Sequence, residues 1–251
     1  MRPICFYSWI LILIPAGVFA QNPVSTATRT IIWPGLSKES EGTGWRLFSK
    51  QYYCVSNWNA SGISFDYASG SGRSSVLVCR DGIPGFCWYH LFVSHYRKFN
   101  GIAGMLQLRF SLIGLKNGPP VFRLGGNILT SFSISPTLIL QTSMYDFPGW
   151  ILNKTAATRG DPAMHILLFN EPGRLIGLAT GFRISQSQFG PVTAGIRVKP
   201  NDQMSLIWFF HALPFGMSIG INWNFNGYIL NGWLEHRNGL GLSPMVEISG
   251  E

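Results

Sequence analysis

The stretch that decides the fold reads Met217-Ser218-Ile219-Gly220-Ile221-Asn222-Trp223-Asn224-Phe225, and Asn226-Gly227 follows it directly. Large apolar residues occupy the odd-numbered positions, and small or polar residues occupy the even-numbered ones. Successive side chains of a β-strand point to opposite faces, so this alternation predicts a strand with one apolar face. Asn-Gly is the dipeptide best suited to a two-residue hairpin turn. The sequence therefore predicts a hairpin that returns through residues 228–233.

The same alternation recurs along most of the chain. It is clear at residues 106–112 and 192–198, and weaker copies occupy residues 87–97, 121–135, 137–145, 164–169 and 174–185. Segments of about 8–11 residues match tilted membrane-spanning strands better than the shorter strands of soluble sheets. We therefore expect an all-β fold, an antiparallel transmembrane β-barrel of roughly 10–14 strands.

A soluble β-sandwich with one buried face would show the same alternation. Two features favour the barrel. The polar face consists of Gly, Ser, Asn and Gln with few charges, and large aromatic residues such as Trp208 and Phe225 lie near strand ends. Outer-membrane barrels carry girdles of aromatic residues at both interfaces with water.

The composition excludes several classes of protein. Charged residues make up only 12% of the chain, which is too few to cover a soluble surface comfortably. Residues 21–251 contain no apolar run long enough for a transmembrane helix, which excludes a helical inner-membrane protein. The net charge of +8 comes from scattered basic residues, so we expect no nucleic-acid partner.

The N-terminus has the pattern of a secretory signal peptide. Arg2 precedes an apolar stretch at residues 4–14, and Val18-Phe19-Ala20 forms a small-residue cleavage pattern. We expect residues 1–20 to be removed and residues 21–251 to form the barrel in the bacterial outer membrane. The alternative is an uncleaved anchor. Residues 21–73 are less periodic, and we expect them to supply the first strands and a plug-like segment.

The cysteines leave two interpretations open. Cys79 and Cys87 flank a turn-rich link and could bridge the mouth of a hairpin in an oxidising compartment. Otherwise these two and Cys54 are small buried apolar residues. The sequence has no metal-ligand spacing, so we expect neither a metal nor a cofactor.

Two segments resemble a known family. Residues 55–63, with Asn59, Gly62 and Ile63 at the matching positions, resemble the N-terminal signature of the long-chain fatty-acid transporter superfamily of outer-membrane barrels. Residues 190–249 look like the closing hairpins of the same barrels. Members from Bacteroidota, including those associated with type IX secretion, carry the element that residues 55–63 resemble. It implies a barrel that passes small apolar solutes or serves as an accessory in protein export.

We therefore expect a non-enzymatic outer-membrane protein whose partners are membrane lipid and either a small apolar ligand or proteins of a secretion machinery. The expected plug and lumen residues are Asn59, Gly62, Ile63, Gln107, Arg109, Arg197, Asn222 and Asn224.

Two other functions remain open. One is an outer-membrane lipid hydrolase that uses His236, for which Ser243 lies across a glycine-rich loop. The other is a secreted soluble β-sandwich that binds carbohydrate through exposed Trp and Tyr. The triplet Asn59-Ala60-Ser61 also fits a glycosylation acceptor, which would suit a secreted eukaryotic protein.

Overall fold

The computed structural model describes residues 42–52, 57–70, 72–115, 118, 120–145, 163–173, 175–185, 189–212, 216–237 and 241–250. They form fourteen strands: β1 (Gly42–Gln51), β2 (Asn59–Ser69), β3 (Gly72–Ile83), β4 (Phe86–Phe99), β5 (Ile102–Leu115), β6 (Val121–Ser133), β7 (Leu138–Tyr145), β8 (Ala163–Asn170), β9 (Ile176–Ser185), β10 (Phe189–Asn201), β11 (Met204–His211), β12 (Gly216–Phe225), β13 (Tyr228–Arg237) and β14 (Gly241–Gly250). The signal-peptide expectation for residues 1–20 lies outside the described residues.

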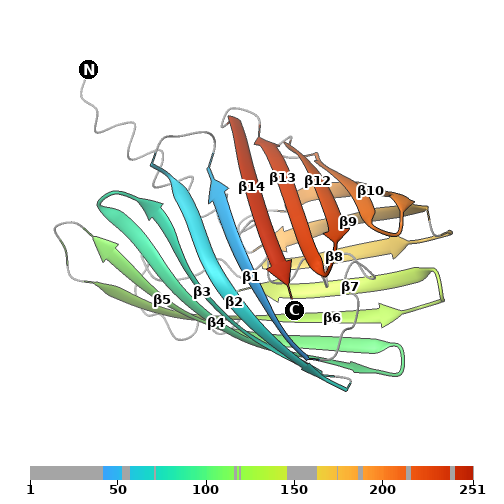
Figure 1. Ribbon diagram of the computed structural model, residues 1–251, viewed down its shortest axis with the longest axis horizontal. Helices are drawn as coiled ribbons and strands as arrows, with labels where there is room; N and C mark the ends of the chain where they lie inside the picture. Colours follow the sequence, from blue (N-terminus) through green and yellow to red (C-terminus); the bar gives the residue numbers. More distant parts are fainter. Residues whose placement is uncertain are drawn as a thin grey trace.

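The strands close into one antiparallel barrel. Each strand pairs with its neighbours in the chain, and β1 pairs with β14 over Trp45–Lys50 to complete the ring. Figure 1 shows this seam, where β1 in blue lies beside β14 in red. The expected barrel is confirmed and the β-sandwich is wrong, because a sandwich consists of two sheets with free edges. None of the described residues forms a helix long and apolar enough to span a membrane.

The two faces of the wall have opposite chemistry. Side chains alternate along each strand between an exposed outer face and a buried inner face, as the burial pattern of β2 shows. Large apolar side chains are exposed outside, including Phe65, Leu108 and Ile221, whereas many charged and amide side chains are buried inside. This arrangement is the reverse of a soluble protein and is that of a barrel whose outer face meets lipid.

The hairpin predicted at Asn226-Gly227 is present. Asn226 has φ of 48° and Gly227 has φ of 85°, the left-handed values that a two-residue hairpin turn requires. The register pairs Phe225 with Tyr228 on either side of this turn. The burial pattern of β12 places Ile219 and Ile221 on the outer face and Ser218 on the inner face. The facing predicted for this strand is therefore confirmed.

The two ends of the barrel differ in their connections. The end that holds Gly42 and Gly250, the termini end, has two-residue turns at residues 100–101, 202–203 and 226–227. The opposite end, the loop end, has the longest connections, at residues 52–58 and 146–162.

Of the two interpretations of Cys79 and Cys87, the structure has the one without a bridge, because both cysteines are free. The β3–β4 hairpin pairs Cys79 with His90 and Cys87 with Gly82. Cys79 is buried on the inner face, and Cys87 lies on the same side of β4 as the outward-facing Tyr89. The two sulfur atoms therefore point to opposite faces of the wall. Cys54 lies outside the described residues.

Candidate functional site

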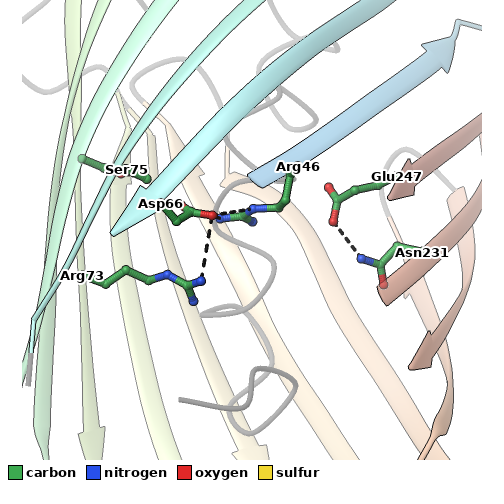
Figure 2. A network of polar contacts seen from close by, with 7 residues as sticks. Arg46, Asp66, Arg73, Ser75, Asn231 and Glu247 are labelled. Atoms are coloured by element: carbon green, nitrogen blue, oxygen red, sulfur yellow. Dashed lines mark hydrogen bonds and ion pairs between the residues drawn. The ribbon is translucent and has the colours of Figure 1, made fainter. Parts of the chain in front are cut away.

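The lumen wall is the candidate site, and near the termini end it carries an ion-pair cluster. Arg46 on β1 forms an ion pair with Asp66 on β2. The Arg46 Nη2 atom lies 2.9 Å from Asp66 Oδ1 and 2.8 Å from Oδ2, and the Arg46 Nε atom lies 3.1 Å from Oδ2. Arg73 on β3 adds a longer ion pair, 3.9 Å from its Nη2 to Asp66 Oδ2. Figure 2 shows both arginines converging on this one carboxylate. Three neighbouring strands are thereby linked inside the barrel.

A chain of amide and carboxylate groups links the other side of the seam. Asn222 Nδ2 donates to Asn231 Oδ1 at 2.6 Å, and Asn231 Nδ2 donates to Glu247 Oε1 at 2.7 Å. These residues lie on β12, β13 and β14, and Figure 2 shows the Asn231–Glu247 bond facing the ion-pair cluster. Directed donors and acceptors of this kind fix the register of adjacent strands.

The seam itself is bridged on the inside. Lys50 Nζ on β1 lies 3.4 Å from Glu235 Oε2 on β13, so the pair crosses over β14. Both side chains are buried. Separating such a buried pair leaves an uncompensated charge, so the contact favours the closed ring over an open one.

The wall formed by β4, β5 and β6 is rich in buried polar groups. His90 Nδ1 lies 2.7 Å from Ser111 Oγ, and Asn127 Nδ2 donates to Gln107 Oε1 at 2.7 Å. Arg109 is buried on the same wall. Buried polar side chains that are hydrogen-bonded to each other form a rigid surface rather than a loose one.

Two apolar clusters interrupt this polar lining. The first, which we call the β1–β4 cluster, contains Phe48, Tyr52, Ala60, Leu77, Cys79 and Phe92, with Trp58 and Tyr145 against it. The second, the β7–β13 cluster, contains Phe169, Ala179 and Ile207, with Ile139, Leu167, Phe209 and Trp233 against it.

Within the β7–β13 cluster, two rings lie against glycines of the wall. Phe209 is paired with Gly195, and Trp233 with Gly220. A Cβ at either glycine would lie 2.6 Å from the ring of its partner, so only glycine lets the rings approach this closely. The ring centroids of Phe209 and Trp233 are 6.5 Å apart with planes 16° from parallel. We call this pair the aromatic panel.

The structure places most of the predicted lumen residues on the inner face. Gln107, Arg109 and Arg197 are buried there, and Asn222 and Asn224 are half-buried on the inner side of β12. Gly62 also faces inward, where an added Cβ would meet Phe48 and Cys79.

The structure corrects the expected positions of Asn59 and Ile63. Both belong to barrel strand β2 rather than to a plug, and both lie on its exposed outer face, where Ile63 is 37% exposed. They share this face because their positions in the strand differ by an even number. The plug expected elsewhere in residues 21–41 lies outside the described residues.

Sequence reasoning missed Lys50, Asp81, Glu235 and Trp233 as lumen residues. Lys50 and Glu235 alternate with exposed neighbours in β1 and β13, so the period of two was the signal that could have placed them on the inner face. Their pairing requires the register across the seam, which local sequence does not encode.

The structure does not bring His236 and Ser243 together. His236 lies on the outer side of β13 with the exposed Leu234, whereas Ser243 is buried on the inner face of β14. The wall therefore separates the imidazole from that hydroxyl. Among the described ranges, no three His, Cys, Asp or Glu side chains are grouped so that they could hold a metal ion.

The fold is similar to those of solved channels and outer-membrane proteins. The toluene transporter TodX of Pseudomonas putida matches with a TM-score of 0.59 and 8% identity, over 84% of this chain and 88% of TodX. The monoaromatic hydrocarbon channel CymD matches with a TM-score of 0.56 and 8% identity, over 84% and 87% of the two chains. Acinetobacter baumannii outer membrane protein Omp33 matches with a TM-score of 0.52 and 7% identity, over 82% and 97%. No family model matches the sequence, and neither does any curated protein.

Proposed function

We propose that this chain resides in the bacterial outer membrane and gives passage to small, largely apolar solutes. The outer face supports the location, because a ring of exposed large apolar side chains is stable only in contact with lipid. The aromatic panel carries the choice of solute. Aromatic rings on the inner wall favour an apolar solute, because such a solute gains about 25 cal/mol for each Å² of its surface that it removes from water there.

The polar lining and the apolar clusters have complementary roles in this proposal. The ion pairs Arg46–Asp66 and Lys50–Glu235 hold the wall in one register. The aromatic panel and the β1–β4 cluster then offer preformed apolar surfaces, the usual lining of small-molecule sites. The described solutes of TodX and CymD, toluene and monoaromatic hydrocarbons, support the same solute class.

We also infer a relationship to the long-chain fatty-acid transporter superfamily, on the resemblance at residues 55–63 and 190–249. The accessory role in protein export, the secretion-machinery partners and the Bacteroidota type stay predictions from that resemblance alone.

Uptake by intact cells tests the proposal. Cells that express the folded barrel should take up radiolabelled toluene several-fold faster than cells without it. Trp233→Gln, which replaces a ring of the aromatic panel, should remove most of this gain. Trp223→Gln is the matched control, because Trp223 lies on the outer face and is 45% exposed. Folded wild-type barrel with no gain in toluene uptake would refute the proposal.

A further inference from the structure

A second polar group on the lumen wall lies at the loop end, beside the β1–β4 cluster. Asp81 of β3 is 5% exposed, and its Oδ2 accepts a hydrogen bond from the Tyr52 hydroxyl at 3.1 Å. The indole of Trp58 also interacts with this carboxylate. The other oxygen, Oδ1, is buried and accepts no hydrogen bond from the residues that the structure describes. A buried acceptor without a hydrogen-bond donor costs free energy, so a ligand that donates a hydrogen bond to this oxygen would gain binding energy.

Lys50 is the basic residue whose charge acts on Asp81. Lys50 Nζ is 3.4 Å from Glu235 Oε2 and 4.8 Å from the centroid of the Tyr52 ring. This ammonium group therefore lies close to the carboxylate without bonding Oδ1. It disfavours a second cation at the same place, so a neutral donor suits Oδ1 better than a charged amine.

The residues next to Asp81 on the inner face are apolar or aromatic. Its cross-strand partners on the inner face are Ala60 of β2 and Trp88 of β4. Ala60 has a small side chain. Trp88 belongs to a line of rings along β4, with its centroid 6.1 Å from that of Phe86 and 5.7 Å from that of His90, and the line continues to Phe92 at a further 5.6 Å. Aromatic faces attract other rings through stacking and apolar contact.

We propose that Asp81, Tyr52 and Trp88 form an acceptor subsite that binds ring-bearing solutes carrying a neutral hydroxyl group. The solute hydroxyl donates to Asp81 Oδ1, and its ring stacks on Trp88. This inference rests on the proposed channel function and adds a polar requirement to it: among apolar solutes of equal size, those with one hydroxyl donor bind best.

Three naphthalenes of nearly equal size test the subsite. 2-Naphthol carries a donor, 2-methylnaphthalene carries neither donor nor acceptor, and 2-methoxynaphthalene carries an acceptor only. Uptake is measured as the increment over cells without the barrel. Wild type should favour 2-naphthol about tenfold over the other two, because a hydrogen bond to a charged group is worth at least that factor.

Asp81→Asn should abolish this preference and raise uptake of 2-methoxynaphthalene. In this variant the amide oxygen accepts the hydrogen bond from Tyr52. The amide nitrogen then takes the place of Oδ1 and donates to the solute instead of accepting from it. Asp202→Asn is the matched control, because Asp202 is exposed in the turn between β10 and β11, outside the lumen. It should keep the wild-type preference.

The outcomes separate the two proposals. No increment for any of the three solutes in wild type overturns the channel function itself. Equal increments for all three in wild type overturn the subsite and keep the channel, and this comparison holds even where Asp81→Asn does not fold. An equal decrease for all three solutes in folded Asp81→Asn also overturns the subsite, because it indicates a structural role only.

Discussion

A side chain at Gly220 should destabilise the barrel, because the Trp233 ring lies directly over this glycine. A Cβ at Gly220 would be 2.6 Å from Cε2 and 2.7 Å from Cδ2 and Cε3 of Trp233. Carbon atoms in favourable contact are about 3.5–4.0 Å apart, so the ring must move by about 1 Å. Overpacking of this kind costs about 1–3 kcal/mol, from which about 0.5–1 kcal/mol is recovered because alanine has less freedom than glycine in the unfolded chain. We expect Gly220→Ala to lower the free energy of unfolding by about 1–2 kcal/mol.

Gly104 provides the control, because it also lies within a strand and a Cβ there would meet nothing within 4 Å. Gly104→Ala should raise the free energy of unfolding by about 0.5 kcal/mol. Both variants are compared with wild type by urea unfolding in lipid vesicles, followed by tryptophan fluorescence. In a Trp233→Ala background the cost of Gly220→Ala should disappear. Equal stability of Gly220→Ala and Gly104→Ala, or an undiminished cost without the Trp233 ring, would show that this ring does not exclude a side chain at Gly220.

Three further changes test the wall, each followed by heat-modifiable mobility in membrane fractions. Ile219→Arg should block stable insertion, because a charge on the lipid face costs about 2–4 kcal/mol at the bilayer midplane. Asn222→Arg on the lumen side should have a milder effect. Equal damage by both variants would contradict the assignment of these residues to opposite faces. Gly227→Val should lose the folded band, because a β-branched residue resists the φ of 85° at this turn, whereas Gly227→Asn should largely keep it; equal folding would show that the turn does not set the register. Arg46→Met should destabilise the barrel by about 3–5 kcal/mol, because it leaves the buried Asp66 charge uncompensated. The double variant Arg46→Met with Asp66→Leu should recover most of this loss. A single variant as stable as the double would show that the Arg46–Asp66 pair does not stabilise the wall.

The alternation of side chains made the wall predictable from sequence. Ile219 and Ser218 could be assigned to opposite faces because the period of two is a local property of the strand. The turn at Asn226 was equally local, since that dipeptide favours the conformation by itself. The assignment failed for Asn59 and Ile63, where a short motif was treated as one lumen-facing unit although adjacent residues of a strand face opposite ways.

Long-range contacts lay beyond the sequence pattern. The Lys50–Glu235 pair joins residues 185 positions apart and depends on how β1 meets β14. The acceptor at Asp81 depends on Tyr52, which reaches it from the end of β1, two strands away in the sheet. Closure of the ring fixes the register behind the first contact, and the pairing of consecutive strands fixes the register behind the second.

This wall has lipid on its outer face and a polar lumen on its inner face. To test this, a nitroxide side chain is placed at each position from 217 to 225 in turn, and its collision rate with oxygen is measured in lipid vesicles. Oxygen concentrates in the hydrocarbon region, so we expect a rate that alternates with a period of two and peaks at positions 219, 221 and 223. A rate without alternation, or one that peaks at positions 218, 220 and 222, would contradict it.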